Sequence, residues 1–281
     1  MDLKLNVKPS LHLSRFEKYE IKEINKIKYI IPVKENNSLT YVDTYVPDML
    51  VDLLNIGKNH DMFDDSFEDC EDQVLDFVNK YGLLGFIRDL PINEYFFLDS
   101  IVVLKDFDAT EPLNIEDKFT VENYFKLFFP NYSDTKITKL IKDLTNLAST
   151  NHSLFKIEEE ISNLLFDINY AEPLSLIVAY ADFLYSILVD EEGPFLDTFC
   201  LNHSNFKPFS FNDETKVVTQ IKYMKQVLDL NFLSLITQKP LLLKICKHCE
   251  KVFIAKNPKA EYDTPQCKNQ ANVYKSREKN K

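Results

Sequence analysis

The chain has 281 residues and a formal net charge of −11 at neutral pH, and 45% of its residues are hydrophobic. A chain of this length and apolarity can bury a sizeable core, which excludes disorder as a description of the whole. Glycine occurs only four times, at Gly57, Gly82, Gly85 and Gly193. Their spacing excludes a Walker-type phosphate loop, a dinucleotide fingerprint and a nucleophile elbow, and with them the enzyme classes that use these motifs.

Short segments rich in β-branched and aromatic residues predict strands. Residues 27–33 and 39–45 are separated by polar turn residues, so we expect them to pair as an N-terminal hairpin. Pro32 would place the first of these strands at a sheet edge, because proline has no backbone N–H to donate to a neighbouring strand. A second short hairpin is expected between residues 206–211 and 216–219.

Helical periodicity dominates the rest of the first 240 residues. One helix is expected to begin at Pro47 and end near Gly57, and a second is expected to end at Gly82, which suits a C-terminal cap. Further helices are expected at residues 121–129, 135–147, 155–168, 173–189 and 218–236. The predicted fold is therefore α+β, with a predominantly α-helical body over residues 1–240 and minor β-hairpins.

The chain shows neither the pattern of a secretory signal nor that of a membrane span. The N-terminus lacks a basic start followed by an apolar stretch. The most apolar segment, residues 173–189, contains Asp182 and is shorter than the roughly 20 residues that cross a bilayer. We expect a cytoplasmic protein without a membrane partner, and in that compartment clustered cysteines more often bind metal than form disulfides.

Residues 241–281 form a second region, in which the spacing of cysteines indicates a metal site. Cys246 and Cys249 have the C-x2-C spacing that lets two thiolates on one turn bind a tetrahedral zinc ion. Thr264 suits the N-cap of a helix whose first turn contains Cys267. Thiolates from a turn and from a helix N-terminus on one ion form a treble-clef arrangement, and the helix dipole favours a thiolate at that place.

The order of residues in this region matches a known signature. The chain has Cys246 and Cys249 as a knuckle, then Tyr262, then Cys-Lys-Asn-Gln at 267–270, then Val-Tyr-Lys-Ser-Arg at 273–277. This order resembles the CGNR-type zinc fingers of bacterial transcription regulators, in which a knuckle, a hairpin and an aromatic-Cys pair precede Cys-Gly-Asn-Arg on a basic helix. Residues 76–86 also resemble a stretch in a bacterial subgroup of that family with a long N-terminal part. The resemblance implies a small zinc-finger module with a role in regulating transcription.

The ligand set departs from the family pattern at one position. The family's aromatic-Cys pair is Tyr262-Asp263 here, so a carboxylate stands where the third of four thiolates is expected. Carboxylate oxygen binds zinc at about 2.0–2.2 Å. We therefore predict a zinc site weaker than a four-thiolate site, formed by Cys246, Cys249, Asp263 and Cys267. The alternatives are a metal-free remnant of a finger held by packing, and a reactive thiol or disulfide.

Charge divides the chain in nearly the same place as the cysteine pattern. Residues 244–281 carry ten basic and four acidic side chains, a net of +6, whereas the remaining 243 residues carry a net of −17. On a helix over residues 265–279, spacings of seven and four place Lys268, Lys275 and Lys279 on one face. The other predicted nucleic-acid contacts on that helix are Asn269, Gln270, Asn272 and Arg277.

These features lead to one main hypothesis and three alternatives. The main hypothesis is a nucleic-acid-binding, transcription-regulatory protein that is not an enzyme, with zinc as its cofactor and DNA as its expected partner. The first alternative is a protein-interaction protein whose finger is structural or degenerate. The second is a basic tail that is simply solvated or that docks on the chain's own acidic body. An enzyme in the body is the weakest hypothesis, because no catalytic constellation can be named.

Overall fold

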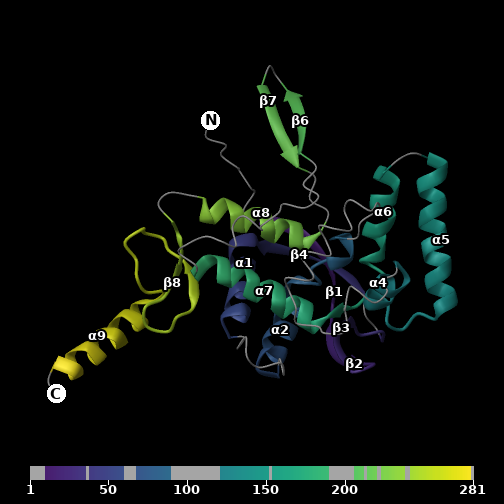
Figure 1. Ribbon diagram of the computed structural model, residues 1–281. Helices are drawn as coiled ribbons and strands as arrows, with labels where there is room; N and C mark the ends of the chain where they lie inside the picture. Colours follow the sequence, from purple (N-terminus) through teal and green to yellow (C-terminus); the bar gives the residue numbers. More distant parts are fainter. Residues whose placement is uncertain are drawn as a thin grey trace.

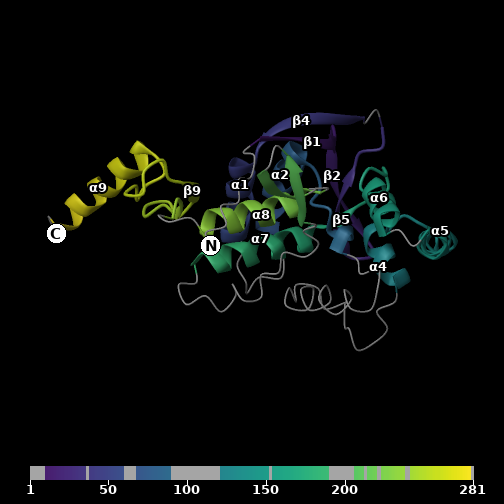
Figure 2. The ribbon, with the colours of Figure 1, turned by 90° about the horizontal axis from the view of Figure 1, so that it is seen from above.

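The computed structural model describes residues 10–35, 38–59, 68–89, 121–151, 154–189, 206–211, 214–219, 223–237 and 241–279. These ranges confirm the predicted mixed α+β class, with small antiparallel sheets beside a predominantly helical body. Within them, no helix combines the length and the apolarity that crossing a bilayer requires. Helices α4, α5 and α6 lie at one end of the molecule and the C-terminal helix α9 lies at the other (Figures 1 and 2).

The helices are α1 (Val46–Asn59), α2 (Glu71–Tyr81), α4 (Val121–Phe128), α5 (Asp134–Asn151), α6 (Leu154–Leu164), α7 (Leu174–Val189), α8 (Met224–Ile236) and α9 (Pro265–Lys279). Two 3-10 turns, η1 (Glu68–Cys70) and η2 (Phe86–Asp89), accompany them. The strands are β1 (Ser10–Phe16), β2 (Tyr19–Ile24), β3 (Ile27–Pro32), β4 (Leu39–Tyr45), β5 (Glu172–Pro173), β6 (Phe206–Phe211), β7 (Glu214–Thr219), β8 (Leu243–Ile245) and β9 (Val252–Ile254).

The N-terminal strands pair differently from the prediction. Strand β3 pairs with β2 and β5, and β4 pairs with β1, so the predicted hairpin between residues 27–33 and 39–45 is wrong. The hairpin is instead β2–β3, which turns at Asn25 and Lys26 with φ of 52° and 68°, the turn geometry that fits the twist of paired strands. The predicted edge position is also wrong, because Pro32 is only the last residue of a central strand.

Helices α1 and α7 pack closely in the centre of the helical body (Figure 1). Leu50, Leu53 and Leu54 of α1 follow helical spacing and are fully buried in the main core. Helix α1 ends at Asn59, near Gly57 as predicted, and Gly57 itself lies in its last turn. A β-carbon there would lie 2.3 Å from the carbonyl oxygen of Ala181 in α7, so glycine permits the close approach of the two helices.

Other predicted boundaries agree with the structure or shift by a few residues. Gly82 has φ of 99° and its N–H donates to the Val78 carbonyl at 2.7 Å, which confirms it as the cap of α2. The predicted hairpin at 206–219 is confirmed as β6–β7. Helix α8 begins at Met224 and not at residue 218, because β7 continues to Thr219.

A buried carboxylate ties β5 to the glycine-containing stretch that follows α2. Glu172 is fully buried and accepts hydrogen bonds from the backbone N–H groups of Leu84 (2.8 Å), Gly85 (2.5 Å) and Phe86 (3.1 Å). The Tyr170 hydroxyl donates a fourth at 2.5 Å. Burial raises the pKa of Glu172, and these four donors oppose that shift. The second stretch of the family resemblance therefore has a structural role in this chain.

Candidate metal centre

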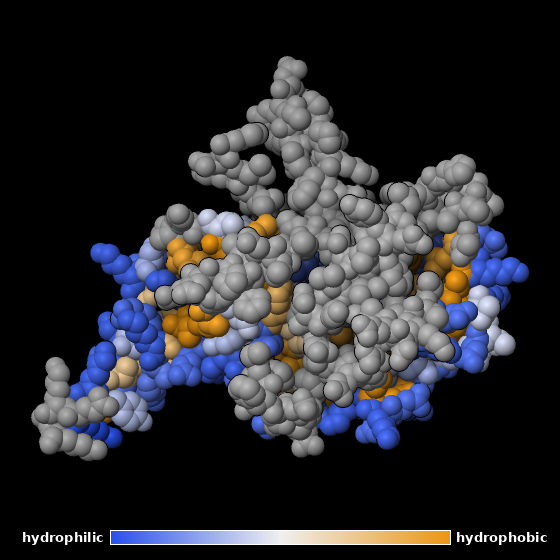
Figure 3. All heavy atoms as spheres, in the orientation of Figure 1, coloured by the Kyte–Doolittle hydropathy of each residue, from blue (hydrophilic) through white to orange (hydrophobic). Residues whose placement is uncertain are grey.

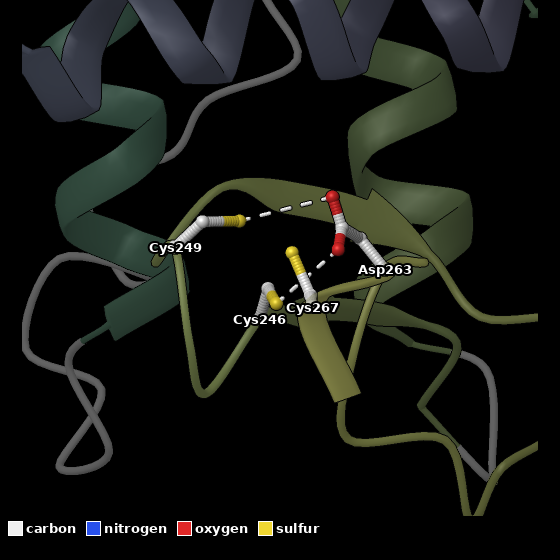
Figure 4. A group of neighbouring side chains, drawn as sticks. All are labelled: Cys246, Cys249, Asp263 and Cys267. Carbon is white, nitrogen blue, oxygen red and sulfur yellow. Dashed lines mark hydrogen bonds between the residues drawn. The ribbon is translucent and has the colours of Figure 1, made fainter. Parts of the chain in front are cut away.

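The C-terminal module consists of the β8–β9 hairpin, a loop and helix α9. The turn between the strands is closed by two backbone hydrogen bonds, from Glu250 N to Cys246 O at 2.8 Å and from Cys246 N to Lys251 O at 2.9 Å. Glu250 takes a left-handed conformation with φ of 59°, which reverses the chain directly after Cys249. This local geometry brings the two cysteines of the C-x2-C pair to one side of the hairpin (Figure 4).

The hairpin is fixed to α1 through one asparagine. The Asn55 side chain accepts a hydrogen bond from Val252 N at 2.8 Å and donates one to Val252 O at 3.1 Å. The Lys58 ammonium donates to the Cys249 carbonyl at 3.1 Å. Leu243 and Val252 are 0% and 2% exposed and belong to the same apolar core as α1. The hairpin is therefore packed into the body, although the cysteine pattern marks it as a separate region.

Four side chains converge where α9 begins (Figure 4). Asp263 contacts both cysteines of the knuckle, with its Oδ1 3.4 Å from Cys246 Sγ and its Oδ2 3.7 Å from Cys249 Sγ. Cys267, in the first turn of α9, completes the group. One ligand atom from each residue lies within 4.8 Å of all the others. The structure thus brings together the four residues predicted as ligands, close enough to hold a metal ion.

Two of the donor separations are close to those around a tetrahedral ion. Two ligands at 2.1–2.3 Å from such an ion are about 3.6–3.8 Å apart, which the two sulfur–oxygen distances to Asp263 approach. Three sulfur donors favour a soft or borderline ion such as zinc over magnesium or calcium. Cys246 is buried and the other three side chains are half-buried, so the group is shielded on one side and accessible on the other.

Hydrogen bonds among the four groups set where their protons reside. The Asp263 carboxylate accepts from Cys267 and raises the pKa of that thiol to about 12. Burial raises the pKa of Asp263, but the hydrogen bonds from Cys267 and Cys246 outweigh it, so the net shift is downward. Burial likewise opposes ionisation of Cys246, and backbone N–H groups lower its pKa overall. A cation that binds here displaces the proton on Cys267, so binding releases protons.

Helix α9 starts as predicted, and His248 holds it against the knuckle. The Cys267 N–H is 3.2 Å from the Thr264 hydroxyl oxygen, which confirms Thr264 as the cap. His248 lies 2.8 Å from the Gln270 side-chain oxygen, and its ring stacks on Tyr274 with centroids 5.8 Å apart. The roles of His248 and Asn55 were not predicted from the sequence, because their partners lie on other elements.

The predicted nucleic-acid contacts all lie on α9 and are exposed where their side chains are described. The exposed residues are Lys268, Asn269, Gln270, Asn272, Lys275 and Arg277. Lys279 is the last residue of the helix, and its side chain lies outside the described part. Among the described side chains of α9, only Ala271 is buried. The helix extends away from the body in both ribbon views, and the part of it that is coloured in the space-filling view is mostly hydrophilic (Figures 1, 2 and 3).

Comparison of the chain with protein-family models, with curated proteins and with solved structures finds no match in any of the three. The class that fold and site define is an α+β protein with a C-terminal cluster of three cysteines and one aspartate that can hold a metal ion.

Proposed function

We propose that this chain is a nucleic-acid-binding regulatory protein whose C-terminal module holds zinc and presents α9 to phosphates. The observation that carries the proposal is the exposed basic helix α9, anchored at its first turn by the four-residue cluster. The resemblance to CGNR-type zinc fingers points to the same function. Zinc would be held by Cys246, Cys249, Asp263 and Cys267, and it would supply no chemistry beyond fixing their positions.

The charges on α9 suit a polyanionic partner. Its described basic side chains are Lys268, Lys275 and Arg277, and no acidic side chain is described between residues 265 and 277. Cations of this kind bind phosphates and release counterions, which makes affinity depend on salt. Asn269 and Asn272 can offer amides to base edges. Gln270 is engaged by His248, so we propose that it positions the helix and does not contact bases.

The test is oligonucleotide binding by the metal-loaded full-length chain. Metal content is measured first, and binding is then followed by fluorescence anisotropy at several salt concentrations. We expect affinity to fall with salt, and Lys275→Gln to reduce the log–log salt slope by about 0.7–0.9, the value for one phosphate contact. Lys142→Gln, an exposed position on α5, is the matched control and should leave the slope unchanged. Absence of binding at low salt would overturn the proposal.

A protein partner is the second candidate, favoured by two apolar side chains on the same helix. Val273 is 48% and Tyr274 is 55% exposed, although both are large and apolar. Clustered exposed apolar residues are typical of protein interfaces. Under this alternative, the metal-loaded chain binds no oligonucleotide, and Lys268 and Lys275 can be replaced without effect on the partner's affinity.

A further inference from the structure

A pocket lies beside the metal cluster, on the side of the loop that leads into α9. It has a volume of about 470 Å³ and is formed by residues 259–265 together with Lys268. A volume of this size is within the range of sites that take small organic ligands. The pocket is therefore large enough to take more of a ligand than a single phosphate group.

Two lysines and two acidic residues line this pocket. Lys259 and Lys268 are exposed and line it from the loop and from α9. In the described part of the chain, the ion pairs involve neither of these two lysines. Lys244 adds a third cation beneath the loop, where its ammonium donates to the carbonyls of Pro258 and Ala260. The pocket is thus suited to an anionic group.

The acidic side chains that line the pocket do not cancel these cations. The Glu261 carboxylate forms an ion pair with Lys247 at 2.6 Å, and this interaction is the main reason why the pKa of Glu261 is lowered. The partner of Glu261, Lys247, does not line the pocket. The carboxylate of Asp263 is directed at the cysteines (Figure 4).

An aromatic side chain supplies the remaining wall. Tyr262 lines the pocket and is half-buried, so part of its surface is accessible. Aromatic side chains next to cations are the recurring means by which proteins hold unpaired nucleotides, because every base can stack on an aromatic face. A base inside a duplex would first have to leave the stack, which costs a few kcal/mol, whereas an unpaired base does not pay this cost.

We infer that this pocket receives one unpaired nucleotide of a single-stranded nucleic acid, with its phosphate on Lys259 and Lys268 and its base against Tyr262. The inference rests on the proposed function and adds to it the form of the nucleic acid. It also adds a second contact region, because Lys259 and Tyr262 lie outside α9. A bound single strand would then run from the pocket along the basic face of α9.

The experiment compares a labelled single-stranded oligonucleotide with the duplex of the same sequence, using the zinc-loaded full-length chain and fluorescence anisotropy. We expect the single strand to bind more tightly. Lys259→Gln should reduce its log–log salt slope by about 0.7, one single-strand phosphate contact. Lys256→Gln, an exposed lysine three residues earlier that does not line the pocket, is the matched control and should have no effect on the slope.

A second set of variants tests the aromatic wall. Tyr262→Leu should weaken single-strand binding roughly tenfold, whereas Tyr262→Phe keeps the ring and should retain it. Because Tyr262 precedes Asp263, the metal content of each variant is measured. If Tyr262→Leu loses metal, its binding data no longer test the pocket. The inference is then tested by the salt slope of Lys259→Gln and by the comparison of single strand with duplex. A free mononucleotide, added as competitor, should displace the oligonucleotide only at far higher concentration, since it lacks the contacts along α9.

The outcomes separate this inference from the function on which it rests. If the duplex binds as tightly as the single strand, or if Lys259→Gln and Tyr262→Leu both behave as the unmodified chain does while Lys275→Gln weakens binding, the pocket inference is overturned and the proposed function stands. If a mononucleotide saturates the pocket and no oligonucleotide binds, both are overturned. If neither form of nucleic acid binds at low salt, both fail together.

Discussion

Replacement of Asn55 by leucine is expected to loosen the attachment of the β8–β9 hairpin to α1. The Asn55 side chain satisfies both the N–H and the C=O of Val252, at 2.8 Å and 3.1 Å, and Val252 is only 2% exposed. Leucine has a similar volume but neither donates nor accepts a hydrogen bond. The N–H and the C=O of Val252 would therefore stay buried and lose their hydrogen-bond partners.

The size of the effect follows from those two bonds. A hydrogen bond contributes about 1 kcal/mol net, and a buried donor or acceptor left without a partner costs about 1–3 kcal/mol. Loss of two such partners at one residue should lower the free energy of unfolding by about 2–4 kcal/mol. Asn55→Asp keeps the acceptor for Val252 N–H but loses the donor to Val252 C=O, so it should also destabilise the chain.

The assay is urea unfolding followed by far-ultraviolet circular dichroism, at fixed metal content. Asn59→Leu is the control, because Asn59 lies one turn later on the same helix and its side chain bonds to Gln73 at the exposed surface. It should change the free energy of unfolding by less than about 0.5 kcal/mol. Equal stability of Asn55→Leu and Asn59→Leu would refute the view that one asparagine secures the hairpin.

Four further outcomes are expected. Gly57→Ala should lower the free energy of unfolding by about 2 kcal/mol or more, although alanine favours helix, because its β-carbon would meet the Ala181 carbonyl at 2.3 Å. Glu172→Gln should cost about 1–3 kcal/mol, because an amide nitrogen would face a backbone N–H donor. Metal affinity, measured by competition with a chromophoric chelator, should rise from pH 6 to pH 8. The sign follows because the ion displaces the proton that the Cys267 thiol, with its pKa of about 12, holds throughout that range. His248→Ala should retain metal but speed amide hydrogen exchange along α9.

Each of these outcomes has a result that would contradict it. Unchanged urea midpoints for Gly57→Ala or Glu172→Gln would show that α1 and α7 can separate freely, or that the buried carboxylate is dispensable. Metal affinity independent of pH would mean that no proton leaves the site on binding. Loss of metal in His248→Ala would show that the ring supports the ligands and not only the helix.

The sequence allowed the C-terminal site to be predicted well because its signals are local. Thr264 caps α9 through an N–H three residues away, and Cys246 and Cys249 share one turn, so spacing alone determines their geometry. Asp263 was also predicted as a ligand from its place in the sequence, and the structure brings this carboxylate to the cysteines.

The errors arose where the outcome depends on distant residues. The composition of residues 27–33 predicts a strand but does not specify its partner, and the Asn25-Lys26 turn lacks the glycine that usually marks a two-residue hairpin. The close approach of Gly57 to the backbone of α7 also depends on a distant helix and could not be predicted from the local sequence. Asn55 contacts a strand 197 residues later, and no periodicity near either residue indicates that pairing.

The position of the β8–β9 hairpin in the main core has a consequence for how the chain is made. Leu243 and Val252 pack with residues of α1, so the apolar cluster around that helix is incomplete until the ribosome has added these late residues. At about 5–20 residues per second, synthesis takes on the order of 10–40 s to proceed from Asn55 to its partner strand. During this interval the nascent body exposes the apolar surface that the hairpin later covers, and that surface is where premature association would begin.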